Sequence, residues 1–219
     1  MLLRDFSQLP AMVGNRFVKG VISWKTIATR LALNTSPTHA KDVMDPHHEI
    51  LSDRSIFEAI PVVGSNGYVL IRSKKDQIIT GIITATDLSS QFHSLAEPFL
   101  LLSEIENLVR TLIGSRFPLS ELKEAKDPAD TQREIKGVSD LAFGEYIRLL
   151  EFLPRWKRLK LAIDRVAFCG NLREVRRIRN DVMHFDPDGI LEEDLLILRN
   201  TASFLKQLQT ISAADTTPK

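Results

Sequence analysis

Hydrophobic and polar positions follow two different patterns along the chain, and the change falls near Gln91. Before it, short runs rich in β-branched and aromatic residues alternate with short helical segments. Two such runs, Tyr68 to Ile71 and Ile78 to Ile83, flank the polar stretch Lys74-Lys75-Asp76, and this predicts a β-hairpin. After Gln91 the apolar residues recur at spacings of three and four, which predicts helices only.

The helical half is expected to contain five main helices. The first has its apolar residues between Leu100 and Leu112, and the stretch from Glu121 to Gly137 is polar enough for a loop or a weak helix. The other predicted helices are Leu141–Phe152, Trp156–Phe168, Leu172–Phe185 and Leu191–Leu208. The fold class is therefore predicted as mixed α+β. An N-terminal α/β module at 1–92 is followed by an all-α helical bundle at 93–212 and a disordered tail at 213–219.

The helix predicted at Leu172–Phe185 has two contrasting faces. Apolar residues at spacings of three and four form one stripe, namely Val175, Ile178, Val182 and Phe185. On the opposite side lie Arg173, Arg177, Asn180 and His184. Asn171 with Glu174 predicts a capping-box start, and Asp186-Pro187-Asp188-Gly189 predicts the stop. We interpret the helix as having one core face and one cationic face able to hold a phosphodiester.

Composition narrows the classes of function. A length of 219 residues allows one large domain or two small ones, and a net charge of +1 argues against a general nucleic-acid coat or a polybasic membrane binder. The single cysteine, Cys169, excludes an internal disulfide and favours a reducing, cytoplasmic setting, with Cys169 as a small core residue. No segment has the roughly 20 apolar residues of a membrane span, and the N-terminal residues lack a signal-peptide run.

An internal repeat links two segments of the first half. Residues 20–27 and 81–88 both begin with glycine and two apolar residues, then a hydroxyl residue, as in a strand that enters a helix. Ser23 and Thr84 take the N-cap position, and Asp87 lies three residues beyond Thr84. One interpretation is that these residues only start helices. The other is that they hold the ribose and phosphates of a nucleotide.

These segments resemble the CBS domain family. The resemblance rests on Asp5-Phe6-Ser7-Gln8-Leu9-Pro10, Gly20-Val21-Ile22-Ser23-Trp24, Ala40-Lys41-Asp42-Val43-Met44 and Gly81-Ile82-Ile83-Thr84-Ala85-Thr86-Asp87-Leu88. It implies a partial first repeat at 1–33, a second at 38–92, and an adenine nucleotide (ATP, ADP or AMP) as a regulatory ligand. Ser23 would contact the nucleotide in the first repeat, and Thr84 and Asp87 in the second. The first repeat has Thr26 at the family's acidic position, which implies a weak or empty site there. It also lacks the opening strand and helix, so either the true start lies upstream of Met1, which we expect, or a partner covers the gap.

Within the helical half, Arg179-Asn180-Asp181-Val182-Met183-His184 fits the pattern R-N-x-x-x-H, and the first helix contains Glu104-x-Glu106-Asn107-Leu108-Val109-Arg110. Together they resemble the HEPN superfamily over residues 95–210. The resemblance implies a homodimer and a metal-independent endoribonuclease, of the kind found in defence or toxin systems. Arg179 and His184 would be catalytic with Asn180 as polar support, and no metal or catalytic cofactor would be required.

This chemistry suits the residue types. Histidine is the side chain best able to take a proton from a 2′-hydroxyl near neutral pH, and arginine stabilises the charge that develops on phosphoryl oxygens. On an ideal helix Arg179 and His184 point about 140° apart, so two apposed copies of the helix would be needed. The structural alternative is that His184 favours the helix dipole and that Arg179 and Asn180 bond to neighbouring helices.

The hypothesis from the sequence is therefore an adenine-nucleotide-sensing CBS module that controls a HEPN-like endoribonuclease, with RNA as substrate, a second copy as partner and no membrane contact. Two alternatives stay open. In one, the chain is a non-catalytic CBS-domain nucleotide sensor or dimerisation scaffold. In the other, the CBS part is a degenerate remnant that binds nothing.

Overall fold

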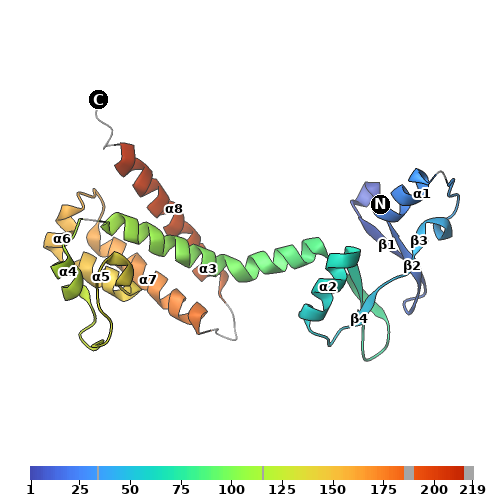
Figure 1. Cartoon of the computed structure of the whole chain (residues 1–219), viewed down its shortest axis with the longest axis horizontal. Coiled ribbons are helices and arrows are strands. Elements are labelled where there is room, and N and C mark those ends of the chain that lie inside the picture. The colour runs from blue at the N-terminus through green and yellow to red at the C-terminus, as the bar shows by residue number, and fades with distance from the viewer. Residues whose placement is uncertain (34, 115, 185–189, 215–219) are drawn as a thin grey trace. The chain divides into compact units, whose positions relative to one another are not determined.

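The computed structural model describes residues 1–33, 35–114, 116–184 and 190–214 (Figure 1). They form two compact units, 1–93 and 94–219, which are described separately below. The first unit combines small sheets with helices and the second is helical, so the predicted mixed α+β class is confirmed. Helix α3 (Ala85–Ile113) begins in the first unit and ends in the second.

The first unit has two three-stranded sheets. In one sheet the order is β1-β2-β3, with strands Gln8–Val13, Phe17–Ser23 and Met44–Asp45 and antiparallel pairing throughout. The other sheet has the order β4-β5-β6, with strands Glu49–Leu51, Tyr68–Arg72 and Ile79–Thr84. Strand β4 pairs with β5 in parallel, and β5 pairs with β6 antiparallel, so the predicted hairpin is confirmed.

The sequence repeat corresponds to a structural repeat. Hairpin β1-β2 leads into α1 (Trp24–Ala32) and hairpin β5-β6 leads into α3, while α2 (Ile56–Asn66) lies between β4 and β5. The two repeat glycines differ in their surroundings. A β-carbon on Gly20 would lie 2.8 Å from the carbonyl oxygen of Asp45, whereas one on Gly81 would meet nothing within 4 Å. Gly20 is therefore required by the close approach of β3.

Two small clusters form the core of the first unit. Val21 of β2 packs with Tyr68 and Leu70 of β5, which joins the two hairpins. Helix α2 adds the second cluster, in which Ala59 and Val63 pack against Val69. The two candidate nucleotide-binding turns follow β2 and β6, each of which contributes to one of these clusters or packs against it.

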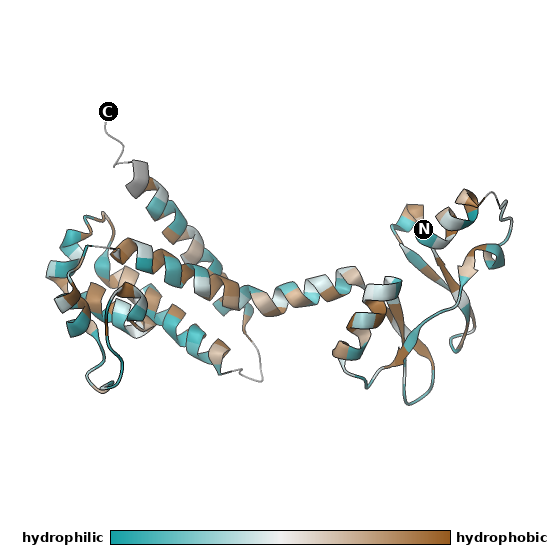
Figure 2. Ribbon diagram, in the orientation of Figure 1, coloured by the Kyte–Doolittle hydropathy of each residue, from teal (hydrophilic) through white to brown (hydrophobic). Residues whose placement is uncertain are grey.

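In its described residues the second unit contains the rest of α3, the 3-10 helix Val138–Asp140 and five further α-helices. These are α4 (Leu119–Ala125), α5 (Phe143–Glu151), α6 (Leu153–Arg158), α7 (Arg165–Met183) and α8 (Glu192–Ala214). One large apolar core joins them and includes Ile105, Tyr146, Leu172, Ile178 and Leu198. Hydrophobic and hydrophilic residues alternate in bands along these helices, as expected for amphipathic helices around one core (Figure 2).

Two predicted helices differ from the structure. The helix predicted at Trp156–Phe168 is wrong, because α6 ends at Arg158 and Lys160 takes a left-handed conformation with φ of 52°. Helix α7 then begins at Arg165, capped by the Asp164 side chain, which accepts the Ala167 N–H at 2.7 Å. The capping-box start at Asn171 is therefore also wrong.

Other predicted boundaries fall partly on residues outside the described ranges. Phe185 and the stop Asp186–Gly189 lie there, as do residues 215–219 of the predicted tail. The first two residues of that tail, 213 and 214, belong to α8. The polar stretch at 121–137 contains the end of α4, and its remainder has no regular secondary structure.

Candidate functional site

The R-N-x-x-x-H motif lies at the C-terminal end of α7. The apolar stripe faces the core as predicted, with Val175 and Ile178 buried. Arg179 is half-buried beside this stripe, whereas Asn180 and His184 are exposed. His184 is the C-cap, and its backbone N–H donates to the carbonyl oxygen of Asn180 at 3.0 Å. The exposed side chains of Asn180 and His184 are therefore accessible to a ligand.

The outer face of α7 is less cationic than its sequence indicates. Arg177 donates to Asp181 at 3.2 Å and to Glu174 at 3.2 Å, and it also forms an ion pair with Asp194 of α8. The hydrogen bonds with Asp194 are the main cause that raises the pKa of Arg177, and those with Glu174 add to it. Arg173 pairs with Glu151 of α5. The interpretation of this face as a gathered positive surface is therefore wrong at Arg173 and Arg177, because acidic residues from three helices neutralise both.

Two arginines in the second half of α7 have no carboxylate partner in the described part of the chain. They are Arg176 and Arg179, which follow each other at a spacing of three. The Arg176 guanidinium lies against Gly144 of α5, where a β-carbon would be 2.8 Å from Cζ of Arg176. Gly144 thus provides the space that the guanidinium occupies.

The motif residues do not converge on one point within a single chain. Helix α7 is continuous from Arg165 to Met183, so the ideal separation of about 140° between Arg179 and His184 applies. One copy of α7 therefore does not aim both side chains at the same phosphate. Asn180, at about 100° from Arg179 and 40° from His184, lies on the His184 side.

The acidic segment of α3 has a structural role. Arg110 donates through Nε to the Tyr146 hydroxyl at 2.8 Å and through Nη2 to Glu106 at 2.6 Å. Tyr146 is fully buried, its hydroxyl donates to the carbonyl oxygen of Val138 at 3.2 Å, and burial raises its pKa. Glu104 pairs with Lys206 of α8 at 2.8 Å. The segment therefore fastens α3 to α5 and α8.

The candidate nucleotide-binding residues form helix caps. Ser23 Oγ accepts the Thr26 N–H at 3.1 Å, and Thr26 Oγ1 accepts the Ser23 N–H at 2.9 Å. At the start of α3, Asp87 Oδ2 accepts the N–H and the hydroxyl of Thr84 at 2.8 and 2.6 Å. The hydroxyl bond is the main reason that the pKa of Asp87 lies below its usual range. The helix-start interpretation therefore accounts for these residues without a ligand.

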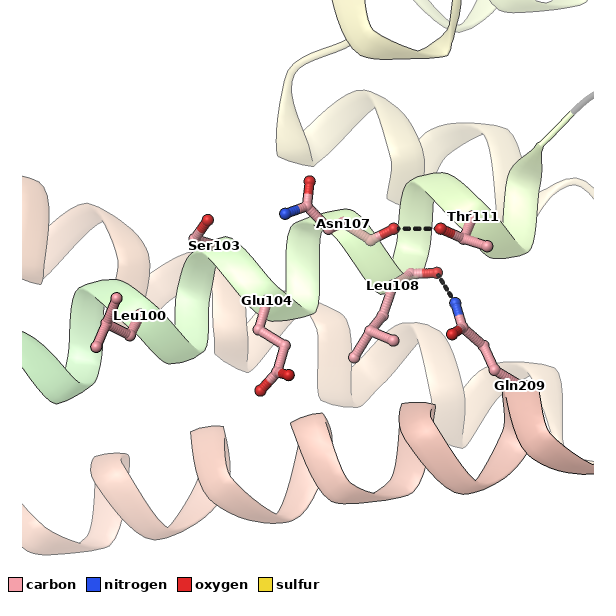
Figure 3. Close-up of a pocket in the computed structure, with 7 residues that line it drawn as sticks. All are labelled: Leu100, Ser103, Glu104, Asn107, Leu108, Thr111 and Gln209. Carbon is pink, nitrogen blue, oxygen red and sulfur yellow. Dashed lines mark hydrogen bonds between the residues drawn. The ribbon is translucent and has the colours of Figure 1, made fainter.

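A groove between α3 and α8 has a volume of about 380 Å³. Its lining consists of Leu100, Ser103, Glu104, Asn107, Leu108, Thr111 and Gln209. Figure 3 shows Glu104 and Leu108 directed toward α8 and Ser103 and Asn107 directed away from it, while Gln209 donates to the Leu108 carbonyl oxygen at 3.4 Å. Because its polar groups diverge, the groove lacks the convergent donors typical of a ligand site.

The basic and aromatic segment around Trp156 is also structural. Trp156 is buried, Arg155 pairs with Glu124, and Arg158 pairs with Glu121 of α4. These ion pairs attach α6 to α4. Among the residues that the structure describes, no three His, Cys, Asp or Glu side chains gather as a metal site, and no helix is long and apolar enough to span a bilayer.

Three features of α7 were not identified from the sequence. The first is Asp194 as the partner of Arg177, and the second is Gly144 as the contact of Arg176. The third is that Arg176, unlike Arg173 and Arg177, has no carboxylate partner among the described residues. The first two are tertiary contacts between helices, which no local pattern reveals. Arg176 has a local signal, because it lies four residues before Asn180 and eight before His184.

No protein-family model and no curated protein matches this chain. The solved structures that are similar to part of it include Staphylococcus aureus OpuCA and a CBS domain protein from Shewanella oneidensis MR-1. Each is 15% identical, covers 42% of this chain and has a TM-score of 0.34, and the match spans 78% and 74% of those chains respectively. At this identity and TM-score the likeness does not assign the chain to a family.

Proposed function

We propose that the chain is a nucleotide-regulated, metal-independent endoribonuclease that acts as a homodimer. The helical unit, as a HEPN-like domain, would cleave RNA, and the CBS-type first unit would bind an adenine nucleotide and alter that activity. The observation that supports the proposal is that some charged residues of α7 are in ion pairs while the catalytic candidates are not. Ion pairs engage Arg173 and Arg177, while Arg179 has no ion pair among the described residues and His184 is exposed.

The reaction uses only groups that this chain and its substrate supply. The 2′-oxygen of a ribose attacks the adjacent phosphorus while neutral His184 takes the 2′-hydroxyl proton. The bond from phosphorus to the 5′-oxygen breaks, that oxygen takes a proton from water, and a 2′,3′-cyclic phosphate and a 5′-hydroxyl end result. Arg179 of the second copy stabilises the phosphoryl oxygens in the transition state, and Asn180 supplies a polar contact.

The proposed regulation rests on the repeated turns that follow β2 and β6. Ser23, Thr84 and Asp87 each lie where a strand enters a helix, and backbone N–H groups at such turns favour phosphate groups. A nucleotide alters activity only if it binds one state of the protein better than another. The proposal therefore requires both nucleotide binding and a change of cleavage rate with ATP, ADP or AMP.

The test is RNA cleavage by purified full-length protein in the presence of EDTA, with and without each nucleotide. His184→Ala and Arg179→Ala are expected to lower the rate by a factor of roughly 10² to 10⁴, because each removes a group that acts on the reacting atoms. Arg173→Ala is the matched control, because Arg173 is on the same helix but paired with Glu151. A wild-type protein that cleaves no RNA under any of these conditions contradicts the proposal.

A second candidate function is a non-catalytic nucleotide sensor or dimerisation scaffold. The observation that favours it is the extent of structural pairing around the motif, in which Arg177 alone contacts Glu174, Asp181 and Asp194. In that case the dimer mass and calorimetric nucleotide binding would be unchanged in His184→Ala, and neither protein would cleave RNA.

A further inference from the structure

We propose that Arg176 is a phosphate-binding residue of the α7 site and that it acts beside Asn180 and His184 of its own chain on single-stranded RNA. The inference rests on the proposed function, and it identifies a residue and a substrate class outside the R-N-x-x-x-H pattern. Three observations support it, namely the spacing of the residues, their charge pairing and the way the guanidinium is presented, together with the geometry of the substrate.

The first observation is the spacing along α7. Arg176, Asn180 and His184 follow each other at intervals of four residues, so neighbouring members are about 40° apart around the helix and about 6 Å apart along it. All three are exposed. They therefore form one continuous stripe, hereafter the α7 stripe, whereas Arg179 lies about 140° from His184. Arg173 and Arg177 lie within about 20° of His184 around the helix, but both are in ion pairs. Arg176, at about 80°, is the nearest arginine of α7 without a carboxylate partner among the described residues.

The second observation is that Arg176 is available for an anion. Its neighbours Arg173 and Arg177 are neutralised by Glu151 and Asp194, but Arg176 has no carboxylate partner in the described ranges. A phosphate at Arg173 or Arg177 would have to compete with an existing ion pair. At Arg176 it would replace only water, so the net gain of binding is larger there.

The third observation is the way that the guanidinium is presented. It lies against the backbone of α5 at Gly144, where a β-carbon would be 2.8 Å from Cζ, 3.0 Å from Nη1 and 3.1 Å from Nε. The side chain is thus supported by a neighbouring helix and loses less rotamer freedom when it binds. A planar guanidinium held in place can contact two oxygens of one phosphate, which an ammonium group does not match.

The fourth argument concerns the substrate. Transfer within one strand needs the 2′-oxygen in line with the leaving 5′-oxygen, a geometry that a flexible single strand reaches and a stacked A-form duplex does not. Sequence-neutral binding of a single strand relies on cationic contacts along its backbone. The α7 stripe offers Arg176 for one phosphate and the base, His184, at about 12 Å farther along the helix axis. Arg176 is therefore placed to hold a phosphate that flanks the scissile one.

The experiment measures binding of a 12-nucleotide single strand of 2′-O-methyl RNA by fluorescence anisotropy. This strand has no free 2′-hydroxyl, so binding is separated from cleavage. Arg176→Gln is expected to raise the Kd about 5- to 20-fold and to reduce the dependence of log K on log salt by about 0.7, the value for one phosphate contact on a single strand. Arg173→Gln, which removes a paired arginine, is expected to change the Kd less than 2-fold.

Gly144→Ala provides a second variant that keeps the arginine. Its methyl group would occupy the space of the guanidinium and displace it, so the Kd is expected to rise about 3-fold or more while circular dichroism and urea unfolding show an intact fold. A 12-base-pair RNA duplex is expected to bind equally to wild type and Arg176→Gln. Equal loss of binding in Arg176→Gln and Arg173→Gln, or no loss in Arg176→Gln, overturns the inference.

The result is separable from the proposed function. If wild type cleaves RNA but Arg176→Gln binds the methylated strand normally, the inference about Arg176 is wrong and the nuclease proposal stands. If wild type cleaves nothing but Arg176→Gln selectively loses binding, the nuclease proposal fails, while α7 retains a single-strand binding surface.

Discussion

Arg177 of α7 and Asp194 of α8 form a two-pronged ion pair in which the Asp194 side chain is only 13% exposed. This pair connects the helix that contains the R-N-x-x-x-H motif to its neighbour. It also explains why Arg177, which the sequence places on the cationic face of this helix, has a structural role. The α7 surface is therefore a mixture of structural and uncommitted charges, and single substitutions can separate the two.

Replacing Asp194 by Ala is expected to destabilise the helical unit. The change leaves Arg177 without its main partner, and the loss of such charge-assisted hydrogen bonds costs about 1–3 kcal/mol. The free energy of unfolding, measured by urea titration, should fall by this amount. Glu151, the partner of Arg173, is more exposed than Asp194. Glu151→Ala is therefore expected to lower the free energy of unfolding by less than about 1 kcal/mol. Equal losses in both variants would contradict a structural role specific to Arg177 and Asp194.

The sequence predicted those parts of the fold that depend on local patterns. The hairpin of β5 and β6 follows from two runs rich in β-branched and aromatic residues around a polar turn, and the buried face of α7 follows from the spacing of Val175 and Ile178. The break between α6 and α7 was missed, because the residues around it stay apolar at helical spacing while the positive φ of Lys160 ends the helix.

The features that the sequence did not predict depend on contacts between residues that are far apart in the chain. The best example is Glu145, which is 2% exposed and accepts hydrogen bonds from the N–H of Asp127, the N–H of Ala142 and the Arg133 guanidinium, at 2.7, 2.7 and 2.6 Å. These bonds organise a polar segment that has no periodic pattern. The residues next to Glu145 in the sequence do not indicate that a loop will bury its carboxylate. In the same way, the residues next to Asp194 do not indicate its pairing with Arg177.

In the first unit, Glu49 of β4 and Arg72 of β5 are expected to make stability depend on pH. Arg72 donates to both carboxylate oxygens of Glu49 at 2.8 and 2.6 Å, and these bonds are the main cause that lowers the pKa of Glu49. Because the folded pKa is lower than the unfolded value of about 4.3, the stabilisation is present above that pH and is lost as the pH falls through the folded pKa.

The measurement compares wild type with Glu49→Gln by thermal unfolding between pH 7 and pH 3. At pH 7 the variant should be less stable by about 1 kcal/mol, since the pair is partly exposed, and the difference should shrink below about pH 4. The exposed pair of Arg30 and Asp45 is the control, and Asp45→Asn should differ little from wild type at any pH. A constant difference down to pH 3 would show that another property of Glu49 is responsible.

Thr84 and Asp87 allow helix capping to be distinguished from nucleotide binding. Asp87→Ala removes the acceptor of two Thr84 hydrogen bonds and is expected to cost about 1 kcal/mol of stability in either case. If these residues also bind a nucleotide, calorimetry with ATP, ADP and AMP should show at least a 10-fold weaker Kd. Thr84→Ser retains the hydroxyl and should bind like wild type. Unchanged nucleotide affinity in Asp87→Ala would leave only the capping role.

The separation of Arg179 and His184 on α7 predicts complementation between two inactive proteins. If a complete site takes Arg179 from one copy and His184 from the other, a heterodimer of Arg179→Ala and His184→Ala contains one site with both residues intact. Equimolar proteins that are unfolded and refolded together form about half heterodimers, each with one of two sites, so about one quarter of wild-type cleavage should return. Each variant refolded alone is the control. If mixing restores no activity although native mass spectrometry detects the heterodimer, the two residues do not act across a dimer, and a site built from one chain must bring them together in some other way.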